Sequence, residues 1–293
     1  MRRAILWVTL LAFLGGCGPG GEAPEKGAPA VSKERAKEAA EVRVVYLSSG
    51  LPVRPDDPAW NNVPVKTIAV LPQTIIVPNG GGTVKEVRVR AAHDGERIAF
   101  LLAWKDDTVD HRVGTSTFRD AVAIGFPLGE SESPPSPFMG DPQHPVNIWQ
   151  WTADFDAASR GRSAFAEMYP HTEGVWYFPQ DDAEDREVRG WRGAEPVMEL
   201  SATGFGTLRR HATQNVSGTG RSANGEWQVV LRRDMSTGSP EDTFFLPGSN
   251  SFMIMAVWNG SNREVNGKKS VTMSWTPVTI EPTLVARRAE GAR

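Results

Sequence analysis

Residues 86–104 read EVRVRAAHDGERIAFLLAW, and this stretch decides the fold class. From Val87 to Ala91 every second residue is apolar and the residues between are arginines, which is typical of a strand with one buried face. Asp94 and Gly95 favour a tight turn, and the apolar run 98–104 then returns as a second strand. The stretch therefore predicts a β-hairpin.

Similar short runs of β-branched and aromatic residues, separated by turn residues, continue along the chain. They predict strands in DAVAIGFP (120–127), VNIWQW (146–151), GEWQVVLRR (225–233), SFMIMAVW (251–258) and SVTMSW (270–275). The Gly-rich PNGGGTV (78–84) predicts a hairpin loop, because no helix follows it as a phosphate cradle would require. We expect a mainly-β fold, an antiparallel β-sandwich with long loop excursions and a few short helices, over residues 42–283.

The ends of the chain have a different composition. Residues 1–17 hold two arginines, an apolar run too short to span a bilayer, and LGGC, which resembles a bacterial lipobox. This predicts a signal peptide and lipidation of Cys17, with a small buried thiol as the alternative. Residues 18–41 predict a flexible tether, and residues 284–293 a polar tail. We expect a lipid-anchored protein at the periplasmic or extracytoplasmic face, with no other membrane contact.

Charge and cysteine content exclude several classes of function. The net charge of −3 argues against nucleic-acid binding, which needs a clustered basic surface. Cys17 is the only cysteine, so the chain cannot hold an iron–sulfur cluster or form an internal disulfide. The absence of a C-x-x-C-H motif means that any haem is bound non-covalently.

Residues 153–218 are charged and irregular, and they predict a long excursion between two strands with a short helix in 157–168. Four aromatic residues in it, namely Trp176, Tyr177, Phe178 and Trp191, form a candidate docking element. Alternatively, these aromatics only cover the sandwich.

Two residues have unusual settings for their chemistry. Met139 places an oxidisable thioether in a Pro/Gly-rich bend. Lys269 shares strand parity with Val271, Met273 and Trp275, whereas Lys268, Ser270, Thr272 and Ser274 form a polar face that we expect in solvent. A lysine on the apolar side requires a salt bridge or a metal, because an unpaired buried ammonium is costly. Of the five histidines, we expect His93 at a surface turn and His111 in a solvated acidic loop.

Several segments together resemble the haem b (gamma) subunit of type II DMSO-reductase-family molybdoenzymes, the ethylbenzene, dimethylsulfide, selenate, chlorate and nitrite-oxidising enzymes. They are LPVRPDDPAWNNVPV (51–65), DAVAIGFP (120–127), FMGDPQHPVNIWQW (138–151), GFGTLRRHATQNVSGTG (204–220), NGEWQVVLRRDM (224–235) and AVWNGSNREVNGKKSVTMSW (256–275). The resemblance implies a sandwich that holds one haem b and has no catalytic activity of its own. It also implies electron transfer between an iron–sulfur subunit, in a complex with a molybdopterin catalytic subunit, and a soluble cytochrome or quinone-linked carrier.

In that family a methionine and a lysine hold the iron, and the matching positions here are Met139 and Lys269. Lys268 and His144 are the alternative ligands. The region 169–196 departs from the family pattern because it looks longer. With both axial positions filled by protein, such a haem carries electrons and has no open site for a substrate. The competing interpretations are a haem-free lipoprotein and a carbohydrate-binding sandwich, which ten tryptophans would suit.

Overall fold

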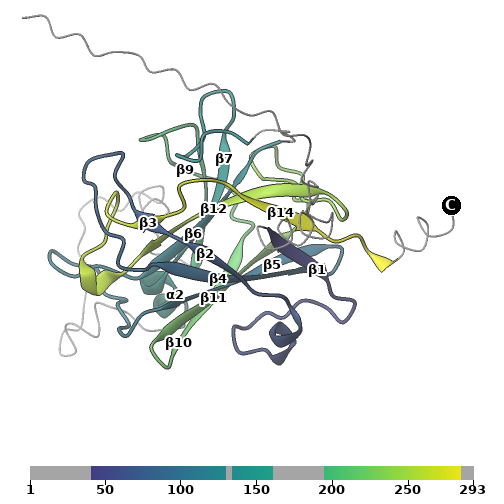
Figure 1. Ribbon diagram of the computed structural model, residues 1–293, viewed down its shortest axis with the longest axis horizontal. Helices are drawn as coiled ribbons and strands as arrows, with labels where there is room; N and C mark the ends of the chain where they lie inside the picture. Colours follow the sequence, from purple (N-terminus) through teal and green to yellow (C-terminus); the bar gives the residue numbers. More distant parts are fainter. Residues whose placement is uncertain (1–40, 130–133, 161–194, 285–293) are drawn as a thin grey trace, which may run out of the picture.

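The computed structural model describes residues 41–129, 134–160 and 195–284, and strands make up far more of them than helices do (Figure 1). The mainly-β prediction is therefore confirmed. Three short helices are described: η1 (Pro58–Asn62), α2 (Ala153–Ser159) and η2 (Gly260–Asn262). The strands are β1 (Val42–Tyr46), β2 (Lys66–Ala69), β3 (Leu71–Pro72), β4 (Glu86–His93), β5 (Arg97–Lys105), β6 (Ala121–Pro127), β7 (Val146–Thr152), β8 (Val197–Ala202), β9 (Arg209–Arg210), β10 (Ser217–Ala223), β11 (Glu226–Asp234), β12 (Asn250–Trp258), β13 (Ser270–Val271) and β14 (Thr276–Ile280).

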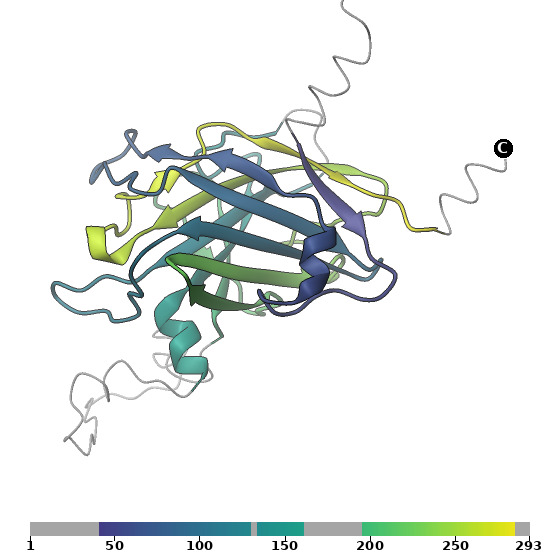
Figure 2. The same cartoon turned by 60° about the horizontal axis from the view of Figure 1, so that its bottom comes forward.

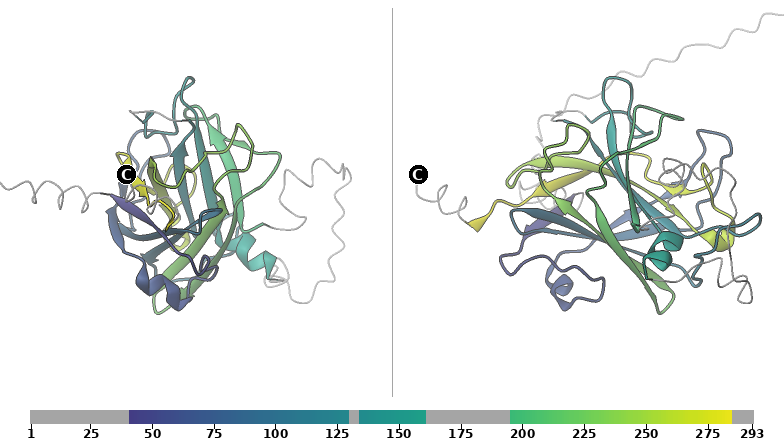
Figure 3. Two further views of the ribbon diagram at one scale, coloured as in Figure 1. Left: turned by 90° about the vertical axis from the view of Figure 1, so that its right-hand side faces the viewer. Right: turned by 180° about the vertical axis from the view of Figure 1, so that it is seen from behind.

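The strands form two layers that share β12. Residues 250–253 of β12 pair with β14, and residues 254–258 pair with β6. The first sheet has the order β10-β11-β5-β4-β1-β14, with β2 also on β4, and the second has the order β12-β6-β7-β8-β9, with β13 and β3 beyond β12. Figure 2 and the two views of Figure 3 show these layers facing each other, with α2 beside β10 and β7.

The pairing is mostly antiparallel, but β1 differs from the sequence prediction. It pairs in parallel with both β4 and β14. A tight hairpin fixes an antiparallel pair, and β1 has no such link to either neighbour, so its direction is not restricted to antiparallel. The sandwich is therefore mixed at this one strand of the described fold.

The core lies between the two sheets and begins with the predicted hairpin. β4 and β5 pair antiparallel, and the carboxylate of Asp94 caps the turn by accepting from the backbone N–H of Glu96 and Arg97. Large aromatic rings fill the space between the layers. Trp151 lies 6.4 Å from Trp104 and 5.0 Å from Trp227, measured between ring centroids. Burial of such rings is a major part of the stabilising free energy of a core.

The outer face of each sheet is also covered. On the first sheet, the segment containing η1 packs the buried Trp60 near Ala92, Ala99, Leu101 and Val230. On the second sheet, loops extend over the central strand β6 and enclose a cavity. No described helix is long and apolar enough to cross a membrane.

The segment 153–218 contains more regular structure than its sequence suggested. It begins with α2 and also contributes β8, β9 and the start of β10. β8 was missed because Glu199 and Ser201 occupy buried positions and break the expected alternation of polar and apolar residues. Residues 161–194, with Trp176, Tyr177, Phe178 and Trp191, lie outside the described residues.

Candidate functional site

A trough runs along the outer face of the second sheet, and its floor is strand β6. Side chains alternate along β6, and those that point to this face are small, namely Ala121, Ala123 and Gly125. The residues between them point into the core. Larger side chains stand on both sides, because Ile148 of β7 and Ile254 of β12 are in register with Gly125. A Cβ at Gly125 would lie 3.0 Å from Ile254 Cγ1. The small residues thus leave a depression between two walls.

Loops from five parts of the chain line this trough and form with it a cavity of about 550 Å³. The lining residues of these loops fall within 75–76 after β3, 113–119 between β5 and β6, 137–139 between β6 and β7, 205–208 between β8 and β9, and 264–269 between η2 and β13. Much of the lining is apolar, including stacked rings of Phe138 and Phe205 with centroids 6.4 Å apart. Cavities of this size and character are typical of cofactor sites.

Met139 lines this cavity from the loop between β6 and β7. Its backbone φ is 71°, and that of the following Gly140 is 75°, so two consecutive residues are left-handed. Hydrogen bonds hold this shape: Gly140 N–H donates to Ser136 O, and Gly204 N–H donates to Met139 O. A side chain at 140 is impossible, because a Cβ there would lie 2.6 Å from His144 O. The fold accepts an unfavourable backbone for a methionine at this position.

His144, the alternative to the lysine ligands, lies away from the cavity. Its side chain is 58% exposed, and its Nδ1 lies 2.9 Å from Asp141 Oδ1. It is not among the residues that line the cavity. The structure therefore does not bring His144 and Met139 to one site.

Lys269 enters the same cavity from the other side, and the Gly-rich loop holds its backbone. Its N–H donates to Gly80 O at 3.0 Å, and its carbonyl accepts from Gln73 N at 3.0 Å. A Cβ on Gly81 would lie 2.4 Å from Lys269 N, so only glycine allows the two segments to approach this closely. The loop 78–84 is closed by a bridge between Gln73 and Gly80, and its role as a support for Lys269 had no sequence signal.

Gln73 is a second residue whose role the sequence did not reveal. It is only 4% exposed. Its Nε2 donates to Gly267 O and Ile76 O, while its Oε1 accepts from the N–H of Ile76. One buried amide thus ties the 75–76 segment of the cavity wall to the loop that precedes Lys269.

The side chain of Lys269 is partly buried, and its Nζ lies 4.9 Å from the centroid of the Trp258 ring. Burial lowers the pKa of this amine. None of the described carboxylates forms an ion pair with it. Lys268, by contrast, is exposed and does not line the cavity. The lysine that strand parity selected is the one that reaches the cavity.

In the predicted polar face, Lys268 and Ser274 are exposed as expected, but the two residues between them are not. β13 has only two residues, and Ser270 and Thr272 are buried rather than in solvent. Ser270 Oγ donates to Val84 O, and Thr272 Oγ1 accepts from Met255 N–H. β13 pairs with β12 on one side and with β3 on the other, so it is not an exposed edge strand.

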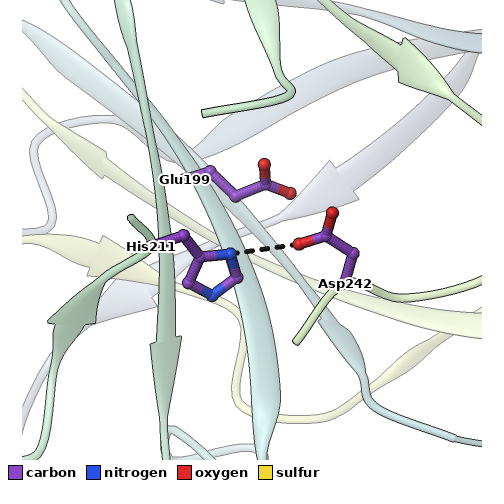
Figure 4. A group of neighbouring side chains, drawn as sticks. All are labelled: Glu199, His211 and Asp242. Carbon is purple, nitrogen blue, oxygen red and sulfur yellow. Dashed lines mark hydrogen bonds and ion pairs between the residues drawn. The ribbon is translucent and has the colours of Figure 1, made fainter. Parts of the chain in front are cut away.

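Two other histidines correct or extend the sequence predictions. His93, expected at the surface, is fully buried, with its Nε2 2.7 Å from Glu281 O. His211 forms a buried group with Glu199 and Asp242, in which ligand atoms lie within 4.8 Å of one another (Figure 4). His211 Nδ1 lies 3.0 Å from Asp242 Oδ1, and its Nε2 is on the far side of the ring.

A cation already occupies this buried group. Arg233 Nη1 donates to Glu199 Oε1 at 2.8 Å, and it lies 4.0 Å from Asp242 Oδ2. Its guanidinium also packs 4.9 Å from the Trp149 ring centroid. We therefore interpret the group as an internal ion network of the sandwich rather than as a metal centre.

Asp120 fixes the edge of the cavity where β6 begins. Its two oxygens accept from Gly260 N–H at 2.8 Å, Asp110 N–H at 2.7 Å and Trp227 Nε1 at 2.9 Å. Burial, with a contribution from the charge of Asp106, raises the pKa of Asp120 to about 7. His111, next to this loop, is partly buried and does not line the cavity.

The tryptophans do not form a sugar-stacking surface in the described part of the chain. Five of them are buried, namely Trp60, Trp104, Trp149, Trp151 and Trp227. The other two described tryptophans are partly buried. The tryptophan content therefore does not support the carbohydrate-binding alternative.

Among solved structures, the chain overlays on a family 9 carbohydrate-binding module from Caldicellulosiruptor kristjanssonii in complex with glucose. The TM-score is 0.41 at 10% identity, covering 83% of this chain and 96% of the module. A carbohydrate-binding protein of Bacteroides uniformis gives a TM-score of 0.43 at 9% identity, covering 82% of this chain and 97% of that one.

Sequence relatives are more informative. The chain is 28% identical to a respiratory nitrate reductase heme subunit of Haloferax mediterranei, over 77% of this chain and 68% of the relative. It is 27% identical to the chlorate reductase gamma subunit of Ideonella dechloratans, over 80% and 82%. It is 25% identical to the dimethylsulfide dehydrogenase gamma subunit of Rhodovulum sulfidophilum, over 82% of each. These relatives confirm the resemblance drawn from the sequence.

The family model described as Ethylbenzene dehydrogenase matches residues 57–270. This range covers most of the sandwich and contains the floor of the trough, Met139 and Lys269. The chain therefore belongs to the ethylbenzene dehydrogenase family.

Proposed function

We propose that this chain is a haem b electron-transfer subunit of an extracytoplasmic molybdenum oxidoreductase complex, and that Met139 and Lys269 hold the haem iron. The observation that carries the proposal is that one cavity receives both side chains, although they lie far apart in the sequence. The names of the relatives, a heme subunit and two gamma subunits of reductase and dehydrogenase complexes, give independent support.

The residues of the cavity suit such a cofactor. Iron in haem takes thioether and nitrogen ligands. The amine of Lys269 is partly buried, has a lowered pKa and has no carboxylate partner among the described residues. Because the lowered pKa weakens its hold on a proton, its lone pair is more readily available to a metal. The small side chains of β6 leave room for a flat ring, and the apolar lining suits an apolar one.

A bound haem would supply one-electron chemistry, and the chain's own residues set its conditions. Met139 supplies a soft ligand, which favours the ferrous state and raises the reduction potential. Ile148 and Ile254 would give the ring apolar surroundings along the trough. If Met139 and Lys269 both bound the iron, no ligand position would remain for a substrate, as expected of an electron carrier.

The remaining parts of the proposal concern the setting of the protein. Electrons would pass between an iron–sulfur subunit, in complex with a molybdopterin catalytic subunit, and a soluble cytochrome or quinone-linked carrier. Cys17, outside the described residues, would carry the lipid anchor at the periplasmic or extracytoplasmic face. Cell fractionation of Cys17→Ser tests the anchor, because this variant should leave the membrane fraction in cells that lack the partner subunits. Equal membrane association would contradict it.

The ligand assignment is tested by adding haem to the purified protein and recording absorption spectra. Met139→Leu and Lys269→Met should each lose the six-coordinate low-spin spectrum of the wild type. His144→Gln and Lys268→Met are matched controls that should keep it, because both side chains lie outside the cavity. A wild-type spectrum in Lys269→Met would reject the assignment.

A further inference from the structure

The cavity has few charged groups. Among the described residues that line it, the charged side chains are Arg119, Glu264 and Lys269. Both oxygens of Glu264 are engaged, since Oε1 accepts from Thr83 N–H and Oγ1 and Oε2 accepts from Asn259 N–H. Lys269 is assigned to the iron. Arg119 is the remaining cation, and binding of the iron does not account for a guanidinium at a largely apolar cavity.

Arg119 lies at the end of the trough where β6 begins. It precedes Ala121 by two residues and lines the same cavity as the small residues of the floor. Helix α2 holds it in place: Nη1 donates to Asp154 Oδ2 at 2.5 Å, and the guanidinium carbon lies 5.1 Å from the Phe155 ring centroid. Its side chain is 30% exposed. The guanidinium is therefore positioned by α2 and still reaches water.

The opposite end of the trough is apolar. Gly125 lies between Ile148 and Ile254, and beyond them the rings of Phe138 and Phe205 stack on each other. The cavity is thus polarised along β6, with a fixed guanidinium at one end and apolar groups at the other. A ligand that matches this arrangement is a flat apolar molecule with carboxylates on one edge.

We propose that Arg119 binds a propionate of the haem and so sets the direction in which the haem lies in the trough. This inference rests on the proposed function. A guanidinium has five N–H donors, so its ion pair with Asp154 leaves it the capacity to bind a second carboxylate. Pairs between arginine and a carboxylate are short, charge-assisted and directional. Arg119 is a positioning residue in this scheme and does not touch the iron.

The test compares haem with its dimethyl ester, in which both propionate charges are removed. Each is titrated by absorbance into the wild type, Arg119→Gln and Arg119→Lys. The wild type should prefer haem by about tenfold more than Arg119→Gln does, the size of one charge-assisted hydrogen bond at a partly exposed site. Arg119→Lys should fall between them, because lysine offers a point charge without the planar fork.

Each preference is a ratio measured within one variant, so a loss of stability from breaking the Arg119–Asp154 pair cancels. Arg221→Gln is the matched control, since Arg221 is 50% exposed and lies outside the cavity. It should keep the wild-type ratio. An unchanged ratio in Arg119→Gln would overturn the propionate assignment alone. Failure of the wild type to form a low-spin complex with either compound would instead overturn the proposed function and this inference with it.

Discussion

Replacing Met139 by glycine should give a more stable haem-free protein than replacing it by alanine, although both changes remove the same thioether. The reason is the backbone φ of 71° at this position. A residue with a Cβ pays about 1–2 kcal/mol for the left-handed region. Glycine avoids that cost but loses about 0.5–1 kcal/mol of conformational entropy on folding. From the middle of each range, the glycine variant should be more stable by about 0.7 kcal/mol.

For a domain of this size, this difference in the free energy of unfolding corresponds to a shift in Tm of about 1–4 °C, measurable by calorimetry on the haem-free protein. Met273 offers a matched control, because it lines the same cavity and its φ is not positive. There the alanine variant should be the more stable of the pair, since glycine has no compensating advantage in ordinary backbone.

Adding haem should change the ranking at residue 139. The wild type gains the iron–sulfur bond of Met139 and should rise above both variants in Tm, whereas alanine and glycine gain no axial ligand. If Met139→Ala is at least as stable as Met139→Gly without haem, then residue 139 is not held in the left-handed region and the reasoning from strain fails.

Three further predictions follow from the floor of the trough, the internal ion network and the cavity edge. Ala123→Leu, at a buried position on the floor of the trough, should abolish haem binding while the near-UV circular dichroism spectrum keeps its wild-type form. Normal haem binding in this variant would show that the haem does not lie against β6. Arg233→Met should cost about 3–5 kcal/mol in urea unfolding, because Glu199 loses its buried partner, and adding Glu199→Gln should recover part of that loss; strictly additive costs would contradict the ion pair. Because the pKa of Asp120 rises from 3.8 to about 7 on folding, the native state keeps a proton that the unfolded state loses, so stability should fall as pH rises between these values. Urea titrations of Asp120→Asn should show a flatter pH profile, and an equal slope would reject this origin.

The parts of the fold that the sequence predicted are those with local signals. The hairpin of β4 and β5 has both alternation and a turn, so each strand confirms the other. The strand that forms the floor of the trough was also predicted, within 120–127, although its role as a floor was not. Strand parity placed Lys269 on the side that proved to line the cavity.

The failures come from partners distant in the sequence. His93 looked like a surface residue at a turn, but Glu281, near the other end of the body, covers it. Glu199 made β8 look irregular, because a charged residue is not expected at a buried strand position. Its charge is neutralised by Arg233, which lies on a strand of the opposite sheet. Ser270 was assigned to solvent because only one face of its strand was expected to be buried. In the structure, protein covers Ser270 as well. None of these partnerships leaves a pattern in neighbouring residues.

Strand β12 has a consequence for how this protein can change during evolution. It belongs to both sheets, and its alternate residues serve two interiors: Met253 and Val257 face the core, and Ile254 and Trp258 line the cavity. Because side chains alternate strictly along a strand, inserting or deleting one residue would exchange the two sets. The Trp258 ring would then enter the core while a valine faced Lys269. We expect this strand to vary by substitution only, with length differences between relatives confined to the loops around it.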